Sequence, residues 1–230
     1  MGAELHETIE GVLADMRWRE NPYFTALEAG SFDRKDFVET QIQFYQAVVF
    51  FSRPMAALCG KIPSSEQRIA ILRNVWEEHG EGDARMAHGA TFRLLLRRLA
   101  DIEPIDIDRR TLWPEVRVFN TTLAGVCVLD DYVVACAAMG MIERSFAEIS
   151  GWIGRGIVAN GWLTRQDLVH YDFHERVDIR HADDFFAVIE PEWPAARYDI
   201  EQGLRLGASV FSGLYRGLWD GRARRLVRGE

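Results

Sequence analysis

The segment Phe173-His174-Glu175-Arg176-Val177-Asp178-Ile179-Arg180-His181 carries two histidines and an aspartate at helical spacing. Each residue of an α-helix turns the chain by about 100°, so steps of four and seven residues return to nearly the same side. His174, Asp178 and His181 would therefore lie along one stripe of a helix. Two imidazoles and a carboxylate suit Fe(II), Mn(II) or Zn(II) better than calcium or magnesium. The segment predicts a helix that contributes three ligands to a metal site.

Helical periodicity also dominates the rest of the chain, beginning with apolar residues spaced by three and four between Glu4 and Arg17. No segment of useful length alternates apolar and polar residues as a strand would. The sequence therefore predicts an all-α protein, a single domain over residues 1–230 with roughly eight helices packed as a bundle. The further helices are expected at about 33–58, 65–78, 84–99, from 114, 122–151, from 164 and 194–227, with a loop over 102–108.

Composition argues against several classes of partner. Hydrophobic residues make up 48% of the 230 residues, enough for a sizeable core, and the net charge of −8 disfavours nucleic acid. The three cysteines, Cys59, Cys127 and Cys136, form no C-x-x-C motif and favour a reducing compartment. The N-terminus lacks a basic signal-peptide region, and the longest uncharged apolar run, Tyr132–Ile142, is too short to span a bilayer. A cytoplasmic protein without a membrane partner is expected.

Glu143 is a candidate ligand on a second helix. It follows the apolar run and has Cys136, Met139 and Ala147 as helical neighbours. A carboxylate in such surroundings would be costly to bury without a cation or another partner. The alternative is that the helix simply reaches the surface at Glu143-Arg144.

The acidic stretch Glu77–Asp83, followed by His88, supplies further candidates. Glu81 and His88 are seven residues apart and would share a stripe if the helix were continuous, whereas Glu78 and His88 would converge only if the glycines break it. The alternative for any one of these acids is a solvated turn. With the ligands above, three histidines and three carboxylates come from three helices, as in carboxylate-bridged di-iron bundles, although the usual paired Glu-x-x-His is absent.

At these residues the sequence resembles the haem-oxygenase-like di-iron oxidases. The motif of that family, a Glu, a His, a second Glu and then His-x3-Asp-x2-His, is met by Glu78 or Glu81, His88, Glu143, His174, Asp178 and His181. The segment 74–82 also resembles the Asn-x3-Glu-x-Gly pattern of the family, and this alignment favours Glu78 over Glu81. The resemblance covers about residues 21–189.

The resemblance implies an O2-dependent oxidase with a haem-oxygenase-like fold and two iron ions; a mixed manganese–iron centre stays open because the ligand set suits both. The expected substrate is a small amino-acid- or fatty-acid-like metabolite of a biosynthetic pathway, oxidised by N-oxygenation or C–C cleavage, with an electron donor as a further partner. A homodimer is expected as the commonest assembly.

Two other functions stay open. A metal-independent hydrolase like thiaminase II would use Cys136 as nucleophile, seven residues before Glu143 and on its stripe. That function leaves the stripe of His174, Asp178 and His181 without a role. A non-catalytic protein that binds a partner through its helical surface is the third hypothesis, and no apolar partner stripe in the sequence supports it.

Overall fold

The computed structural model describes residues 1–228, except for the side chains of residues 169 and 172–177. Over this range the chain forms ten α-helices, with four short 3-10 helices between them. The α-helices are α1 Ala3–Asp15, α2 Pro22–Glu28, α3 Arg34–Cys59, α4 Ser65–Glu78, α5 His88–Ala100, α6 Pro104–Arg109, α7 Pro114–Leu129, α8 Tyr132–Ala159, α9 Val169–Ile189 and α10 Trp193–Gly221. The described residues contain no strand, so the predicted all-α fold is confirmed.

Helix starts follow the capping residues in the sequence. The Asp33 carboxylate accepts hydrogen bonds from the first backbone amides of α3, and the Ser64 hydroxyl accepts one from α4. The caps of α3 and α4 explain why the predicted starts at about residues 33 and 65 agree with the structure. Thr164 and Asp167 form a capping box for the 3-10 helix Arg165–Asp167, so the helix expected from 164 begins later, with α9 at Val169.

Other predicted boundaries are wrong. The helix expected over 122–151 is two helices, because Asp131 caps the start of α8 and thereby separates it from α7. The loop expected over 102–108 contains α6, which begins with a proline and has a capping box. The helix expected from 84 begins at His88, and the last helix ends at Gly221 rather than near 227.

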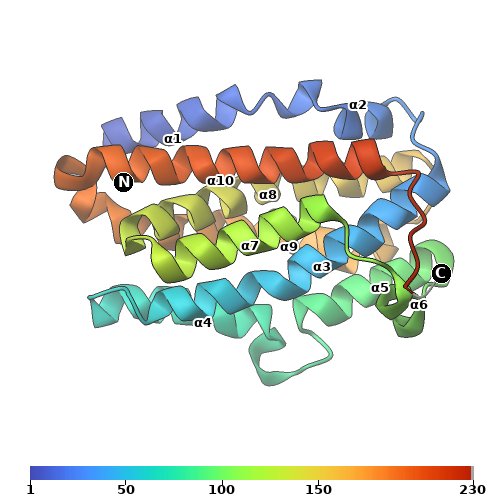
Figure 1. Ribbon diagram of the computed structural model, residues 1–230, viewed down its shortest axis with the longest axis horizontal. Coiled ribbons are helices and arrows are strands. Elements are labelled where there is room, and N and C mark those ends of the chain that lie inside the picture. The colour runs from blue at the N-terminus through green and yellow to red at the C-terminus, as the bar shows by residue number, and fades with distance from the viewer. Residues whose placement is uncertain (229–230) are drawn as a thin grey trace.

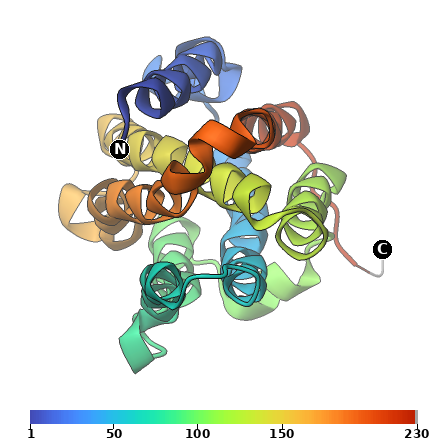
Figure 2. The same ribbon diagram turned by 90° about the vertical axis from the view of Figure 1, so that its left-hand side faces the viewer.

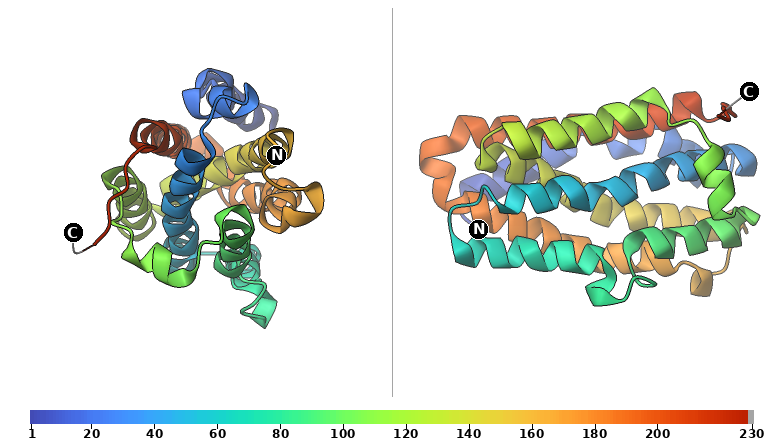
Figure 3. Two further views of the ribbon diagram at one scale, coloured as in Figure 1. Left: turned by 90° about the vertical axis from the view of Figure 1, so that its right-hand side faces the viewer. Right: turned by 60° about the horizontal axis from the view of Figure 1, so that its bottom comes forward.

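The long helices run side by side along one axis (Figure 1). Viewed along that axis, α8 lies in the interior and packs against α9 and α10 (Figure 2). Buried residues occur on nearly all faces of α8, which agrees with this central position. Below it, α4 and α5 follow one another along the same side of the bundle, next to α3 and α9 (Figure 3). The turn between α4 and α5 therefore lies partway along the bundle rather than at one of its ends, and it projects outward from the other helices (Figure 1).

The interior is one hydrophobic cluster to which every α-helix contributes. Its largest fully buried side chains are mostly aromatic, among them Trp113, Tyr23, Tyr171 and Tyr215. No described helix is long and apolar enough to cross a membrane. Against this apolar background, the buried charged groups in the middle of the bundle need a separate explanation.

Candidate metal centre

The turn between α4 and α5 brings Glu78 and His88 together. α4 ends at Glu78, Gly80 and Gly82 adopt positive φ angles of 71° and 93°, and α5 begins at His88. A Cβ atom on Gly80 would lie 2.5 Å from the Ala87 backbone nitrogen, so this turn requires glycine. As a result, Nδ1 of His88 lies 2.8 Å from a carboxylate oxygen of Glu78, with both side chains buried.

Glu143 enters the same region from α8, where it is only 3% exposed. Burial raises the pKa of its carboxyl group well above the usual range, and the nearby charges of Asp178 and Glu78 raise it further, while the Asn74 amide counteracts them. Burying an acid among other acids is costly unless a cation compensates. The surroundings of Glu143 therefore favour bound positive charge.

Asp178 and His181 project inward from α9, one turn apart and both fully buried. Nδ1 of His181 lies 3.9 Å from an oxygen of Glu143 and 3.8 Å from an oxygen of Asp178. Burial raises the pKa of Asp178 well above its usual range; His181 lowers it, and Glu78 raises it. The third member of the predicted stripe, His174, lies outside the described side chains.

Glu77 fixes the orientation of the His181 ring. Nε2 of His181 lies 2.7 Å from a Glu77 oxygen, which also accepts a hydrogen bond from Arg180. A carboxylate can only accept, so Nε2 donates its proton to Glu77, and in the neutral ring the lone pair of Nδ1 faces Glu143 and Asp178. A metal ion bound at Nδ1 requires this tautomer, and carboxylate–histidine pairs of this kind commonly support metal ligands.

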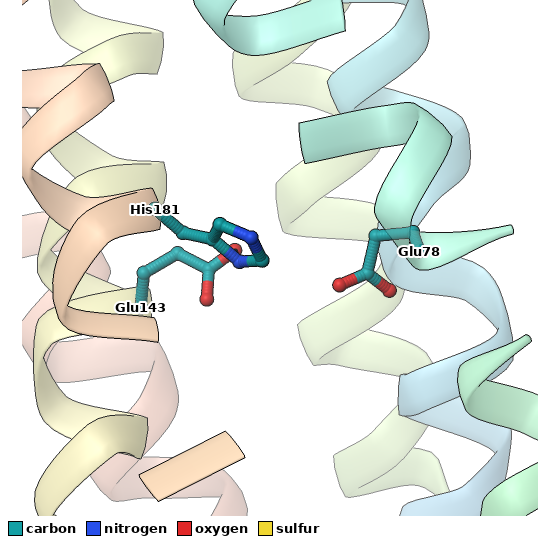
Figure 4. A group of neighbouring side chains, drawn as sticks. All are labelled: Glu78, Glu143 and His181. Atoms are coloured by element: carbon teal, nitrogen blue, oxygen red, sulfur yellow. The ribbon is translucent and has the colours of Figure 1, made fainter. Parts of the chain in front are cut away.

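Ligand atoms of Glu78, Glu143 and His181 all lie within 4.8 Å of one another. Glu143 and His181 approach from one side and Glu78 from the other, and the three side chains point toward a common centre (Figure 4). Bonds from such atoms to a metal are about 2.0–2.2 Å long, so small shifts of the side chains would enclose one ion. Two of the inward-facing atoms, Oε1 of Glu143 and Nδ1 of His181, are buried without a hydrogen-bond partner among the described residues, which fits a site for a cation.

The position of Glu78 in its helix points the same way. It is the last residue of α4, next to Glu77, where the helix dipole places partial negative charge. Acids at a helix C-terminus destabilise the helix, and burial adds to the cost. A cation bound between Glu78 and Glu143 would offset both effects.

The structure distinguishes between the two acids that the sequence left as alternatives. Glu81 is exposed, has a φ of 53° and lies in the short 3-10 turn after α4. The helix is not continuous between Glu81 and His88, because Gly80 and Gly82 break it. Glu81 therefore does not share a helical stripe with His88. Of the two acids, Glu78 therefore lies with the predicted ligands and Glu81 lies outside them.

Sequence reasoning missed the role of Glu77, and for His170, one turn before His174, it predicted either a residue that supports the ligands or a surface residue. Glu77 immediately precedes a ligand candidate, and only its contact with His181 across the helices reveals its role. His170 is buried, and its Nδ1 lies 3.1 Å from the Thr91 hydroxyl, one turn beyond His88 on α5. The position of His170 four residues before His174 was the sequence feature that suggested a role for it. Because His170 is buried, the structure disfavours the alternative that it is a surface residue.

A cavity that opens to solvent reaches the ligand cluster from between α3, α7, α8 and α10. Glu78, His88 and Glu143 form part of its wall. The remaining described lining residues are apolar: Phe44, Ala47, Val48, Phe51, Phe119, Ile142, Phe146 and Phe211. A small molecule in this cavity would lie against the ligand cluster.

Cys136 lies apart from this cavity. It is fully buried in α8, beside Cys127, and does not line the cavity. Burial raises the pKa of its thiol far above the usual value, and Cys127 and Cys59 add to the shift. A nucleophilic cysteine needs a lowered pKa and access to substrate, so the structure disfavours the hydrolase hypothesis.

Known structures share this fold across nearly the whole chain. A domain of unknown function with a haem oxygenase-like fold from Shewanella denitrificans aligns with a TM-score of 0.75 and 12% identity, covering 94% of this chain and 91% of that one. A TenA homologue from Pseudomonas syringae pv. tomato gives 0.74 and 18%, covering 94% and 90%. A TenA homologue from P. horikoshii gives 0.74 and 13%, covering 95% and 97%. At these identities the likeness establishes the fold alone.

A search of curated proteins gives no match to the chain. A family model described as iron-containing redox enzyme, of the haem-oxygenase type, matches residues 38–210, more than half of the chain. The matched region includes every residue predicted to hold metal. The chain thus belongs to the family of iron-containing redox enzymes, on a haem-oxygenase-like fold.

Proposed function

We propose that this protein is an O2-dependent non-haem di-iron oxidase that oxidises a small metabolite. The observation that carries the proposal is the convergence of Glu78, Glu143 and His181, three buried ligand-type side chains from three different helices. Membership of an iron-containing family supports iron as the metal. Bound Fe(II) would supply the redox chemistry with O2 that the side chains alone lack.

Two irons are supported by the number of donors near one another. Besides the three convergent residues, His88 contacts Glu78 and Asp178 lies next to His181. His174 is the sixth ligand proposed from the sequence. Three carboxylates would balance most of the charge of two divalent ions, a common arrangement in helical bundles. A manganese–iron pair would fit the same donors.

The chain's own residues would prepare the site in three ways. Glu77 holds the proton of His181 on Nε2 and so keeps Nδ1 available. Phe44, Phe146 and Phe211 make the wall of the cavity beside the ligands largely apolar. Glu143, whose pKa is raised, would lose its proton to solvent when metal binds, since a carboxylate must be deprotonated to act as a ligand.

Anaerobic reconstitution tests the proposal. The purified protein is incubated with Fe(II), freed of unbound metal and analysed for iron per chain, then mixed with air-saturated buffer while O2 consumption and visible absorption are followed. Near two irons per chain and O2 consumption faster than that of free Fe(II) are expected. Absence of iron binding would overturn the proposal.

Matched variants sharpen the result. Glu143→Ala and Glu78→Ala should each lower iron stoichiometry while the helical circular dichroism is retained. The controls are Glu148→Ala and Glu81→Ala, which change exposed acids near the same helix positions. Equal iron content in ligand and control variants would contradict the ligand assignment. Hydrolase activity that needs no iron and is lost in Cys136→Ala would favour the thiaminase-like alternative instead.

A further inference from the structure

An exposed apolar stripe runs along the outer side of α4. Ile69, Leu72 and Trp76 are 56%, 50% and 55% exposed. The rotation of about 100° per residue places the three side chains within about 60° of one another around the helix. α4 lies at the outer edge of the bundle, and none of the described helices covers this side of it (Figure 2). Single apolar residues are ordinary on a protein surface, whereas a contiguous group of them marks an interaction surface.

The structure corrects the expectation that the chain has no apolar stripe for a partner. The sequence pattern did not separate this stripe from the core side of α4, because the buried Ile71 directly precedes Leu72. Trp76 is also held in place at the end of the stripe. A Cβ atom on Gly82 would lie 3.0 Å from its ring, so the indole packs against the turn that follows α4. Ordered, half-exposed tryptophans are enriched among the residues that dominate protein interfaces.

Two charged residues flank the stripe on one side. Glu66 and Arg73 lie about 60° and 40° around the helix from Ile69, in the same direction. Both are exposed, and neither forms a salt bridge with a described residue. They are seven residues apart, with the acid nearer the start of α4. The flank therefore carries a negative charge near one end of the stripe and a positive charge near the other.

A second copy of the same chain complements this flank. When a two-fold axis perpendicular to α4 relates two copies, the two helices run antiparallel and the same flank of each helix meets in opposite directions. Glu66 of one copy then faces Arg73 of the other, and symmetry forms the pair twice. Opposite charges across a contact favour the correct partner and fix its register.

The stripe fits the same register. If Ile69 of one copy lies opposite Leu72 of the other, Trp76 lies opposite Ser65, which is a small, exposed residue on the same stripe. In this register Glu66 and Arg73 are offset by only about 3 Å along the helix axis, which their long side chains can span. Large residues thus meet small ones, and opposite charges meet, in a single arrangement.

From this complementarity we infer that Ser65, Ile69, Leu72 and Trp76 form the contact surface of an antiparallel homodimer, in which α4 packs against α4 of a second copy. The inference does not depend on the proposed oxidase activity. Glu78 lies at the end of α4, on the side opposite Ile69. The dimer contact would therefore hold in place the helix that supplies this candidate ligand.

Sedimentation equilibrium of the purified chain tests the assembly. A dimer is expected, and Leu72→Asp, which places a charge in the centre of the contact, should weaken it at least about 30-fold. Val118→Asp is the matched control, because Val118 is an apolar residue of α7 that is 61% exposed. This control should dimerise within about twofold of the unmodified chain, since it lies outside the stripe. Circular dichroism checks that both variants remain folded.

Two results would overturn the homodimer. One is an unmodified chain that stays monomeric up to about 100 µM, where even a weak dimer would be populated; the stripe would then serve a different partner. The other is a dimer that Leu72→Asp leaves intact, which would place the contact on another surface.

Charge reversal tests the antiparallel arrangement. Glu66→Arg and Arg73→Glu each bring like charges together at both ends of the contact, so each should weaken the dimer at least about fivefold. The variant with both changes restores two opposite-charge pairs in exchanged order and should dimerise within about twofold of the unmodified chain. If the double variant is no tighter than the single variants, Glu66 and Arg73 do not face each other and the proposed arrangement is wrong.

Discussion

At the scale of single residues, the Glu143 carboxyl group links pH to the stability of the metal-free protein. Burial and the charges of Asp178 and Glu78 raise its pKa well above the ordinary value of 4.5. Below that value the group is protonated in both the folded and unfolded states. As the pH rises above it, the unfolded state loses the proton and the folded state keeps it, so folding stability is progressively lost until the pH passes the raised pKa.

We therefore predict that the metal-free protein is less stable at pH 8 than at pH 5. Glu143→Gln removes the titrating group while keeping its shape, so it should raise the free energy of unfolding at pH 8 by at least about 1 kcal/mol and flatten the pH dependence. The control Glu148→Gln changes an exposed acid on the same helix and should stay within about 0.5 kcal/mol. Urea unfolding at both pH values measures this. A Glu143→Gln variant that is less stable at pH 8 would refute the argument.

Glu77 gives a second prediction for a single residue. Glu77→Gln keeps the size of the side chain but removes the charge that holds the proton of His181 on Nε2. We expect a loss of about 10- to 100-fold in metal affinity, with unchanged helical circular dichroism. Competition between the protein and a chelator for Co(II), followed by visible absorption, measures the affinity. Glu81→Gln serves as the exposed control, and a Glu77→Gln affinity equal to that of the control would rule out the supporting role.

At the scale of helices, the close approach of α8 and α10 depends on glycine. A Cβ atom on Gly207 would lie 2.4 Å from the backbone oxygen of Ala138, whereas one on Gly213 would meet nothing within 4 Å. Gly207→Ala should push the helices apart and cost about 1–3 kcal/mol of stability. Gly213→Ala, on an exposed position of the same helix, should instead stabilise by about 0.5–1 kcal/mol. Thermal unfolding of the two variants compares them, and the same sign of change in both would contradict this account.

The sequence predicted a helix boundary correctly where a capping residue lies at the boundary itself. Caps such as Asp33 and Ser64 act within their own helix start, and the predicted starts there agree with the structure. The break before α8 was missed because the apolar pattern continues on both sides of Asp131, so the periodicity looked unbroken. The short α6 was missed because a loop with proline was read as irregular.

The candidate site shows the same division between local and long-range information. The spacing of Asp178 and His181 predicted that both would share one face of a helix, and both are buried there. The choice between Glu78 and Glu81 depended on the φ angles of the intervening glycines, which the sequence alone did not fix. The contact between Glu77 and His181 joins residues more than one hundred positions apart, so no local pattern contains it.

At the scale of the whole molecule, the ligand cluster joins three helices that the core also packs together. Glu78 lies on α4, Glu143 on the central α8 and His181 on α9. Without metal, burial and then the charges of neighbouring acids disfavour the ionised forms of Glu143 and Asp178, and both effects raise the pKa values of these groups. A bound ion would offset both effects through bonds that cross the helix interfaces. Metal binding and global stability should therefore be coupled.

The last prediction tests this coupling with a redox-inactive ion. Zn(II) at about 100 times its dissociation constant should stabilise the folded protein by about 2.7 kcal/mol, because only the folded state presents the assembled site. For a chain of this size, that corresponds to an increase of about 5–10 °C in the melting temperature, reversed by a chelator. Glu143→Ala should lose most of the increase, while Glu148→Ala should keep it. If Zn(II) shifts both variants equally, the ion binds elsewhere, and Glu78, Glu143 and His181 would not form the metal centre.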